Sequence, residues 1–303
     1  MNCRHCNQGL EYEFLDLDFM PPSNAYLSSE ELNKPELTFP LRLFVCCNCW
    51  LVQTDDYTCV EDLFTDKYAY FSSVSKQWLI HAEKYVESII REIGLTKNSF
   101  VVEVASNDGY LLKNFLAEKI SCLGIEPTAS TADKAEEQGI PVCREFFGKE
   151  LALKLEKEGK RADLIIGNNV LAHVPDINDF SEGMKILLKE SGTITLEFPH
   201  LMELLKHKQF DTVYHEHFSY LSLFTVNKIF KNAGLKIWNV DILGTHGGSL
   251  RVYGCHLDFQ REVSPIVNKI MLEEEQFGLH DLDIYNSFQE HVNNIKNDFL
   301  DFL

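Results

Sequence analysis

Cysteine spacing is the clearest chemical signal in the sequence. Two C-x2-C pairs occur, one at the start of the chain and one after residue 45. Such pairs place four thiolates on tight turns, which is the ligand set of a closed, tetrahedral structural zinc site. Cys47 and His5 are competing ligands that the spacing does not favour, and four reduced thiols without a metal are the alternative. The predicted zinc ligands are Cys3, Cys6, Cys46 and Cys49.

A second candidate site is a polar turn after an apolar run. The segment E-V-A-S-N-D-G at 103–109 lies between an expected strand and an expected helix, where backbone N–H groups and the helix dipole face a ligand. Only Gly109 remains of the G-x-G-x-x-G pattern, so a dinucleotide pyrophosphate would approach poorly. Glu126 ends the next expected strand, where a carboxylate can accept both ribose hydroxyls of an adenosine.

The two acids beside this turn favour a cationic ligand. S-adenosylmethionine, which carries a sulfonium and an ammonium group, fits, and a turn without a ligand is the alternative. A second polar loop follows another expected strand at 164–167 and should lie at the same sheet edge. The expected cofactor-binding residues are Glu103, Ala105, Ser106, Asn107, Gly109, Glu126, Asn168 and Asn169.

An acid–base cluster lies in Y-H-E-H at 214–217. Histidine beside glutamate and tyrosine suits proton abstraction near neutral pH, with Glu216 orienting or charging an imidazole. A metal site or a polar loop without a role are the alternatives. His173, in N-N-V-L-A-H at 168–173, is either a structural histidine that caps a helix or an active-site residue.

A Gly-Gly pair stands in T-H-G-G-S-L-R at 245–251. Gly-Gly before a strand permits close approach of the backbone to a substrate, and Arg251 is a candidate for binding an anion. A hairpin turn without a ligand is the alternative. The candidate substrate-binding residues are His246, Gly247, Ser249 and Arg251.

Alternating strands and helices must position these side chains. This rhythm predicts an α/β fold with a doubly wound parallel sheet. A one-sided apolar stripe from residue 77, ended by Gly94, predicts a preceding helix. The expected strands are 100–105, 122–126, 140–143, 164–167, 193–198, 235–243 and 250–253. The expected helices are 110–118, 130–138, 149–157, 180–189 and 224–232.

Three regions are expected along the chain. Residues 1–66, broken by prolines, predict a loop-rich zinc-binding module, residues 67–256 the α/β domain, and residues 257–303 a helical region. Apolar residues in the last region continue on one helical face to the end of the sequence. We therefore expect an incomplete C-terminal domain, or a face that packs on a partner, formed by Phe288, Val292, Ile295, Phe299 and Phe302.

Composition excludes several classes of protein. The 303 residues carry 28 Lys plus Arg against 46 Asp plus Glu, a formal net charge of −18, which disfavours nucleic acid as a partner. Apolar residues at 45% support a packed core, and no apolar run has the length of a membrane span. Nine cysteines, an odd count without an export signal, indicate a reducing cytoplasm. A monomer or weak homo-oligomer is expected.

Several motifs in one order carry a resemblance. The four cysteines, E-V-A-S-N-D-G, N-N-V-L-A-H-V-P-D, E-F-P-H, Y-H-E-H-F-S-Y and H-G-G-S-L-R-V-Y follow one another along the chain. Together they resemble the TDP-4-keto sugar C-3-methyltransferases, which build branched deoxysugars. The resemblance implies a zinc module, a class I methyltransferase (Rossmann-like) domain for S-adenosylmethionine, and a C-terminal domain that helps hold a nucleotide-sugar substrate.

The resemblance also implies roles for individual residues. His217 would remove the proton at sugar C-3, with Tyr214 and Glu216 assisting or stabilising the enolate. His173 would lie across the sugar, and Tyr68 would reach in from the zinc-module side. Two other classes of protein remain open: a methyltransferase with an oxygen or nitrogen acceptor, and a non-catalytic zinc-ribbon interaction protein. An NAD-dependent sugar enzyme is weakened by the missing glycines.

Overall fold

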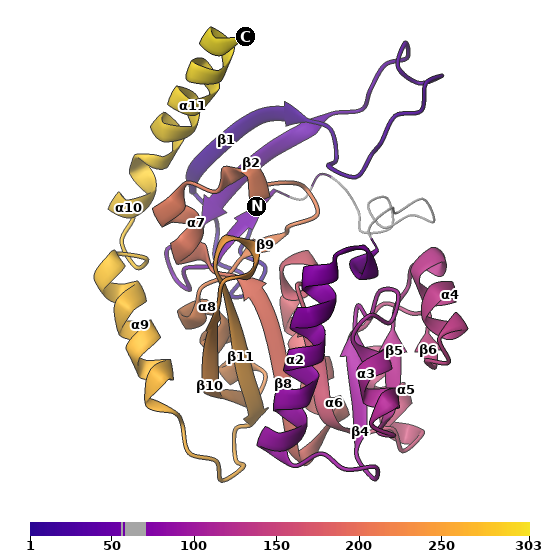
Figure 1. Cartoon of the computed structure of the whole chain (residues 1–303). Coiled ribbons are helices and arrows are strands. Elements are labelled where there is room, and N and C mark those ends of the chain that lie inside the picture. Colours follow the sequence, from indigo (N-terminus) through magenta and orange to yellow (C-terminus); the bar gives the residue numbers. More distant parts are fainter. Residues whose placement is uncertain (56, 58–70) are drawn as a thin grey trace.

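A seven-stranded sheet forms the centre of the structure (Figure 1). The computed structural model describes residues 1–55, 57 and 71–303. The strand order is β10-β11-β8-β7-β4-β5-β6. The strands are β4 (Phe100–Val104), β5 (Ser121–Ile125), β6 (Val142–Cys143), β7 (Ala162–Asn168), β8 (Leu188–Pro199), β10 (Leu235–Leu243) and β11 (Ser249–His256).

The sheet is mixed rather than wholly parallel. The pairs within β6-β5-β4-β7-β8 are parallel, whereas β11 runs antiparallel to both β8 and β10. The loop between β10 and β11 is too short for a crossover, and strands joined in this way must pair antiparallel. The expectation of a parallel sheet therefore holds for five strands and is corrected at β11.

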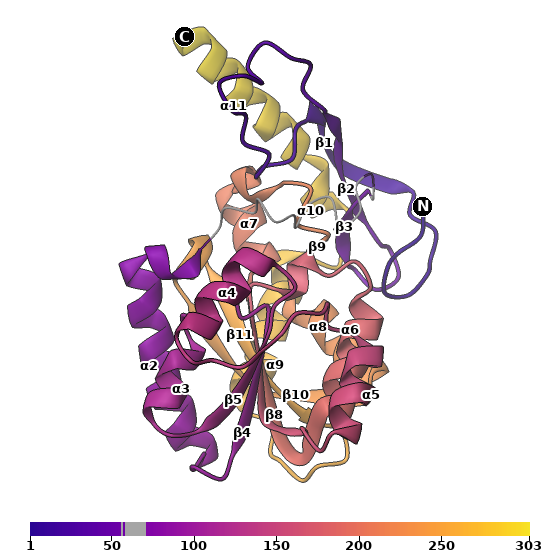
Figure 2. The same ribbon diagram turned by 90° about the vertical axis from the view of Figure 1, so that its right-hand side faces the viewer.

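Helices cover both faces of this sheet (Figure 2). One apolar cluster joins it to α2 (Lys76–Ile93), α3 (Leu112–Ala117) and α4 (Ala129–Glu137). The cluster on the other face includes α5 (Lys149–Lys157), α6 (Ile177–Leu187), α8 (Leu223–Asn232) and α9 (Pro265–Phe277). This double cover explains why the parallel strands read as apolar runs.

Helix α2 forms where its apolar stripe predicts it. The Ser75 side chain caps the first turn by accepting from the Trp78 amide, and Gly94 ends the helix at φ 68°. Only glycine adopts that left-handed conformation without a steric cost. The buried face of α2 includes Tyr85 and Ile89, so the periodicity was a correct guide to the core.

A second, four-stranded sheet lies beyond the carboxyl ends of the parallel strands (Figure 1). It consists of β1 (Tyr12–Met20), β2 (Phe39–Val45), β3 (Val52–Thr54) and β9 (Ser219–Tyr220). The N-terminal module thus contains a long hairpin where the sequence suggested mainly loops. Strand β9 comes from the Y-H-E-H-F-S-Y segment, so this segment is built into the N-terminal sheet.

The C-terminal residues form α9, α10 (Asp283–Asn286) and α11 (Phe288–Phe302). Phe288 and Val292 are buried in the cluster beneath the β1–β2 hairpin. Farther along the same face Ile295, Phe299 and Phe302 are 40%, 60% and 83% exposed, and α11 extends away from the body (Figure 1). Among the described residues, no helix combines the length and apolar character needed to cross a membrane.

A buried carboxylate attaches α9 to the domain. Glu274 is fully buried, and its Oε1 accepts from His200 Nε2 at 2.7 Å and from the Leu223 amide at 2.6 Å. Its Oε2 accepts from the Phe224 amide at 2.9 Å. Glu274 therefore satisfies first-turn donors of α8 while it holds His200 next to the end of β8.

We expect Glu274→Gln to lower the free energy of unfolding by about 3 kcal/mol, because a buried charged acceptor with several donors is lost. Urea denaturation followed by circular dichroism measures this change. Glu275→Gln, at an exposed position on the same helix, is the control and should change stability little. Equal stability of the two variants would contradict the anchoring role of Glu274.

Candidate active site

One cavity of about 770 Å3 lies at the carboxyl ends of the parallel strands. This size is within the usual range for small-molecule sites. Its walls include residues that follow β4, β5, β7 and β8, together with Ser23, Asn24 and Tyr26 from the N-terminal module. The predicted site residues that line it are Ala105, Asn107, Glu126, Asn168, Asn169, His173, Tyr214, His217 and His246.

The turn after β4 is held in an unusual backbone conformation. Ala105 and Asn107 have φ values of 56° and 50°, in the left-handed region that non-glycine residues rarely adopt. Glu126 Oε2 accepts from the Asn107 amide at 2.9 Å, and its Oε1 accepts from the Thr128 amide at 3.0 Å. These two donors fix the carboxylate of Glu126 at the cavity wall, where it can accept hydroxyl groups.

Several buried acceptors next to this turn have no hydrogen-bond partner among the described residues. They include both carboxylate oxygens of Glu103, Asp108 Oδ1, Asn168 Oδ1 and Asn169 Oδ1. Buried polar atoms in native proteins normally find a partner, which can be a bound ligand. These acceptors lie near Glu126, whose carboxylate can accept the ribose hydroxyls of an adenosine. Such a set fits S-adenosylmethionine, whose ammonium group is a donor.

Three predicted cofactor residues do not line the cavity. Glu103 is buried, and its burial, together with Glu126 and Asp108, raises its pKa well above the usual range for a carboxyl. Ser106 is fully buried next to Gly124. Gly109 has φ 77°, and a Cβ there would meet the Ile140 side chain at 2.3 Å. Ser106 and Gly109 shape the turn, and Glu103 supplies buried negative potential only when ionised.

His217 is held from both ring nitrogens. Its Nδ1 lies 2.9 Å from the Thr212 carbonyl oxygen, which can only accept, so Nδ1 carries the proton. Nε2 is therefore the acceptor nitrogen, and the Tyr214 hydroxyl donates to it at 2.8 Å. His173 lies against the same ring, with the ring centroids 4.7 Å apart.

Burial sets the protonation state of these histidines. It is the main cause that lowers the pKa of His217 well below its ordinary value, and nearby His173 and His246 lower it further. Burial also lowers the pKa of His173. Both imidazoles are neutral at pH 7, so His217 Nε2 keeps a basic lone pair, which in this structure accepts from the Tyr214 hydroxyl.

The Glu216 carboxylate accepts hydrogen bonds from the N-terminal module and not from an imidazole. Its Oε2 accepts from Ser23 Oγ at 2.7 Å and its Oε1 from Asn24 Nδ2 at 3.0 Å. The backbone oxygen of Glu216 accepts from His173 Nδ1 at 2.7 Å. The carboxylate thereby connects the acid–base segment to the N-terminal module, while the backbone orients His173.

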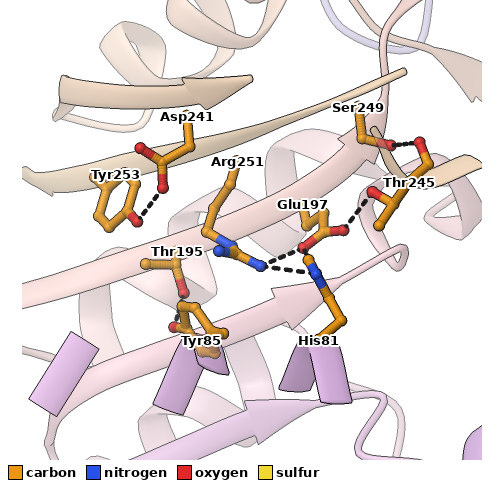
Figure 3. A network of polar contacts seen from close by, with 9 residues as sticks. All are labelled: His81, Tyr85, Thr195, Glu197, Asp241, Thr245, Ser249, Arg251 and Tyr253. Atoms are coloured by element: carbon orange, nitrogen blue, oxygen red, sulfur yellow. Dashed lines mark hydrogen bonds and ion pairs between the residues drawn. The ribbon is translucent and has the colours of Figure 1, made fainter. Parts of the chain in front are cut away.

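The Gly-Gly segment contributes one of its predicted residues to the cavity wall. His246 lines the cavity, whereas Gly247, Ser249 and Arg251 do not. Arg251 is 5% exposed and donates to Glu197 Oε2 at 2.6 Å (Figure 3). Its guanidinium also lies 4.2 Å from the ring centroid of Tyr85. Arg251 thus contacts a carboxylate and an aromatic ring away from the cavity wall, which does not favour the expected role in binding a substrate anion.

The four predicted zinc ligands converge at one point. Their sulfur atoms all lie within 4.8 Å of one another, and the Cys3–Cys49 and Cys6–Cys46 sulfur pairs are 3.4 and 3.5 Å apart. Sulfurs that surround a tetrahedral zinc at Zn–S of about 2.3 Å are about 3.8 Å apart. The arrangement fits a structural zinc, and Cys47 is exposed outside it.

Arg4, between the first two cysteines, connects the zinc turn to the candidate site. Its Nη1 donates to the Pro175 carbonyl at 2.9 Å, and its Nη2 donates to the Thr54 carbonyl at 3.3 Å. The guanidinium lies 5.3 Å from the ring centroid of Phe218. Arg4 thus contacts the segments that carry His173 and His217.

Sequence reasoning missed some cavity residues. Trp78 and Tyr110 line the cavity, although the sequence predicted them only as parts of two helices. Ser23 and Asn24 carried no motif that relates them to residue 216. Tyr68, which the resemblance placed in the site, lies outside the described residues, so its role stays a prediction.

Comparisons with known proteins agree with this geometry. A methyltransferase domain model matches residues 78–240, more than half of the chain. A C-methyltransferase C-terminal domain model matches residues 244–303, and a zinc binding domain model matches residues 3–64. The C-methyltransferase NovU of Streptomyces niveus is 32% identical over 286 residues, which are 94% of this chain and 68% of the relative.

Two solved structures are similar to part of this chain. The PH0226 protein from Pyrococcus horikoshii OT3 aligns with a TM-score of 0.51 at 16% identity, over 62% of this chain and 94% of that one. The magnesium protoporphyrin IX methyltransferase ChlM of Synechocystis PCC 6803, solved with SAH, aligns at 0.47 and 14% identity, over 58% and 82%. The family models and the NovU relative show that this chain belongs to the S-adenosylmethionine-dependent C-methyltransferases and carries an N-terminal zinc module.

We expect Cys46→Ser to bind less than one zinc per chain and to melt at least about 5 °C below the unchanged protein, because the thiolate set is broken. Mass-spectrometric metal analysis and thermal denaturation measure both effects. The matched control is Cys47→Ser, which should keep one zinc. Loss of the metal from both variants alike would contradict the assignment of Cys46 as the ligand.

Proposed function

We propose that this enzyme methylates carbon, at C-3, of a nucleotide-linked 4-keto-deoxysugar. One observation carries the proposal. The neutral, hydrogen-bonded pair of His217 and Tyr214 lines the same cavity as Glu126, Asn168 and Asn169, the acceptors expected to bind the cofactor. Methylation of an oxygen or nitrogen nucleophile needs less help from a base. A carbon acid next to a ketone requires a positioned base, which His217 supplies.

The cofactor end of the cavity would be formed by residues of the turn after β4 and of the strand ends beside it. Glu126, with its carboxylate fixed by two amides, would accept the ribose hydroxyls. Asn168 and Asn169, whose amide oxygens have no described partner, would accept from the ammonium group. S-adenosylmethionine supplies an electrophilic methyl group when bound.

The substrate end would be formed by the acid–base pair. His217 Nε2 takes the proton from C-3, and the electron pair of that C–H bond moves into the enolate of the adjacent C-4 ketone. The Tyr214 hydroxyl, which donates to Nε2 in the structure, would turn to the developing enolate oxygen. His173, held by the Glu216 backbone, would face the same sugar from the other side.

The proposal is tested by incubating the full chain with S-adenosylmethionine and a panel of TDP-4-keto-6-deoxysugars. Mass spectrometry should find a product one methyl heavier, and deuterium from solvent should enter C-3 of unreacted substrate. Methylation of an oxygen acceptor, without exchange at carbon, would instead assign the enzyme to another acceptor class. Absence of any methylated sugar across the panel would contradict the substrate class.

We expect His217→Gln to lower methyl transfer and C-3 deuterium exchange at least about 100-fold, because the base is lost. The Kd for S-adenosylmethionine, measured by calorimetry, should stay within about threefold. His207→Gln, at an exposed histidine, is the matched control and should retain activity. Unimpaired exchange in the His217 variant would remove this residue from the base role.

The lowered pKa of His217 predicts the pH dependence. A base that is protonated only well below its ordinary pKa stays active until the pH falls through that lowered value. We therefore expect kcat to be flat from pH 8 to about 6.5 and to decline only under more acidic conditions. An acid limb centred at or above about pH 6.5 would show that a different group, or a more exposed histidine, controls the reaction.

A further inference from the structure

A buried carboxylate connects two parts of the cavity wall that are far apart in sequence. Glu197, near the end of β8, is fully buried. Its Oε1 accepts from the Thr245 hydroxyl at 2.9 Å, and its Oε2 accepts from Arg251 Nη2 at 2.6 Å (Figure 3). His81 Nε2 lies 2.9 Å from the same Oε2.

Each carboxylate oxygen of Glu197 contacts a residue that is itself next to a residue of the cavity wall. Thr245 precedes His246 in the short turn η4 (Thr245–Gly247). On the other side, the His81 ring stacks on Trp78, with the ring centroids 4.9 Å apart. The two wall residues also contact one another, because the ring centroids of His246 and Trp78 are 5.2 Å apart.

The His246 turn needs such support. His246 has φ 49°, a left-handed conformation that is strained for a residue with a side chain, and it is exposed at the surface of the chain. The turn is held by side chains: Ser249 Oγ donates to the Thr245 carbonyl, and Gln209 Nε2 donates to the Gly247 carbonyl. The Thr245–Glu197 hydrogen bond ties the side chain of this turn to β8, beside the Ser249 contact to β11.

The charge state of Glu197 suits this task. Burial alone would raise its pKa, but His81 and Arg251 outweigh that effect and keep the pKa below the ordinary value. An ionised, fully buried carboxylate is a strong and fixed acceptor. Its position is set by Arg251, which itself packs over Tyr85.

We propose that Glu197 is a positioning residue for substrate binding: through Thr245 it holds His246, and through His81 it holds Trp78, as two adjoining walls of the sugar-nucleotide site. This inference rests on the proposed function, because it takes His246 as a contact to that substrate. Arg251, the residue that the sequence suggested for the substrate, serves instead to fix Glu197.

A double-mutant cycle between Thr245 and His246 tests the proposal. Thr245→Val removes the hydroxyl but leaves the Glu197–Arg251 pair intact, and Thr245→Ser restores a hydroxyl. We expect Thr245→Val to raise KM for the nucleotide sugar about tenfold, the size of one hydrogen bond, with kcat changed less than threefold. Thr245→Ser should return KM to within about twofold of the unchanged enzyme, and the Kd for S-adenosylmethionine should not move.

The His246 variants of the cycle distinguish a positioning role of Thr245 from a general effect on stability. His246→Ala should raise KM at least as much, and adding Thr245→Val to His246→Ala should have no further effect, since the threonine acts through the histidine. Additive effects of the two substitutions would overturn the proposal, as would a normal KM in Thr245→Val. Failure of the unchanged enzyme to methylate any nucleotide sugar would instead overturn the proposed function.

Glu197 itself is tested with a paired substitution. Glu197→Gln leaves Arg251 buried without its counter-ion and can fail to fold, so Glu197→Gln combined with Arg251→Met is used beside it. A folded double variant, judged by its melting temperature, should show the same rise in KM and unchanged cofactor binding. A folded double variant with normal KM would contradict the positioning role of Glu197.

Discussion

Docking of the zinc turn on the carboxyl edge of the central sheet is the contact on which the candidate site depends. Arg4 reaches the carbonyls of Pro175 and Thr54 and packs over Phe218. Pro175 and Phe218 belong to the two segments that carry the site histidines. A short N-terminal turn has little apolar surface of its own to bury, so metal ligation is what gives it a fixed shape. The zinc module therefore contributes order to the active site without any chemistry at the metal.

The same docking produces the dry environment of the histidines. His217 is buried where β9 joins the N-terminal sheet, and Thr54 of that sheet donates through its backbone amide to the Phe218 carbonyl at 3.2 Å. Burial keeps the imidazole neutral and strengthens the hydrogen bonds that fix its tautomer. A looser contact between the N-terminal sheet and this segment would admit water. It would then change both the pKa of His217 and the hydrogen bonds that fix its tautomer.

Sequence alone predicted the local features well. The apolar stripe of α2, the parallel strands and the four cysteines follow from periodicity and spacing within short windows. The β1–β2 hairpin was missed because its alternation is broken by irregular register between Glu13 and Phe19. The roles of Glu216 and Arg251 were unreadable because their partners Ser23, Asn24 and Glu197 are distant in the chain, and only folding brings them together.

Charge is divided between the two ends of the cavity. Glu126 lies on the wall at the proposed cofactor end, and Glu103 and Asp108, buried close by, have carboxylate oxygens without a partner among the described residues, so this end offers acceptors to a cationic ligand. The other end presents neutral histidines and hydroxyl donors, and the acids nearby, Glu197 and Glu216, are each paired with donors. A developing enolate is an anion and would be destabilised beside an unpaired carboxylate. Under the proposed mechanism, pairing these two acids would let a strongly acidic chain, with a net charge of −18, keep a negatively charged intermediate stable next to a cationic cofactor.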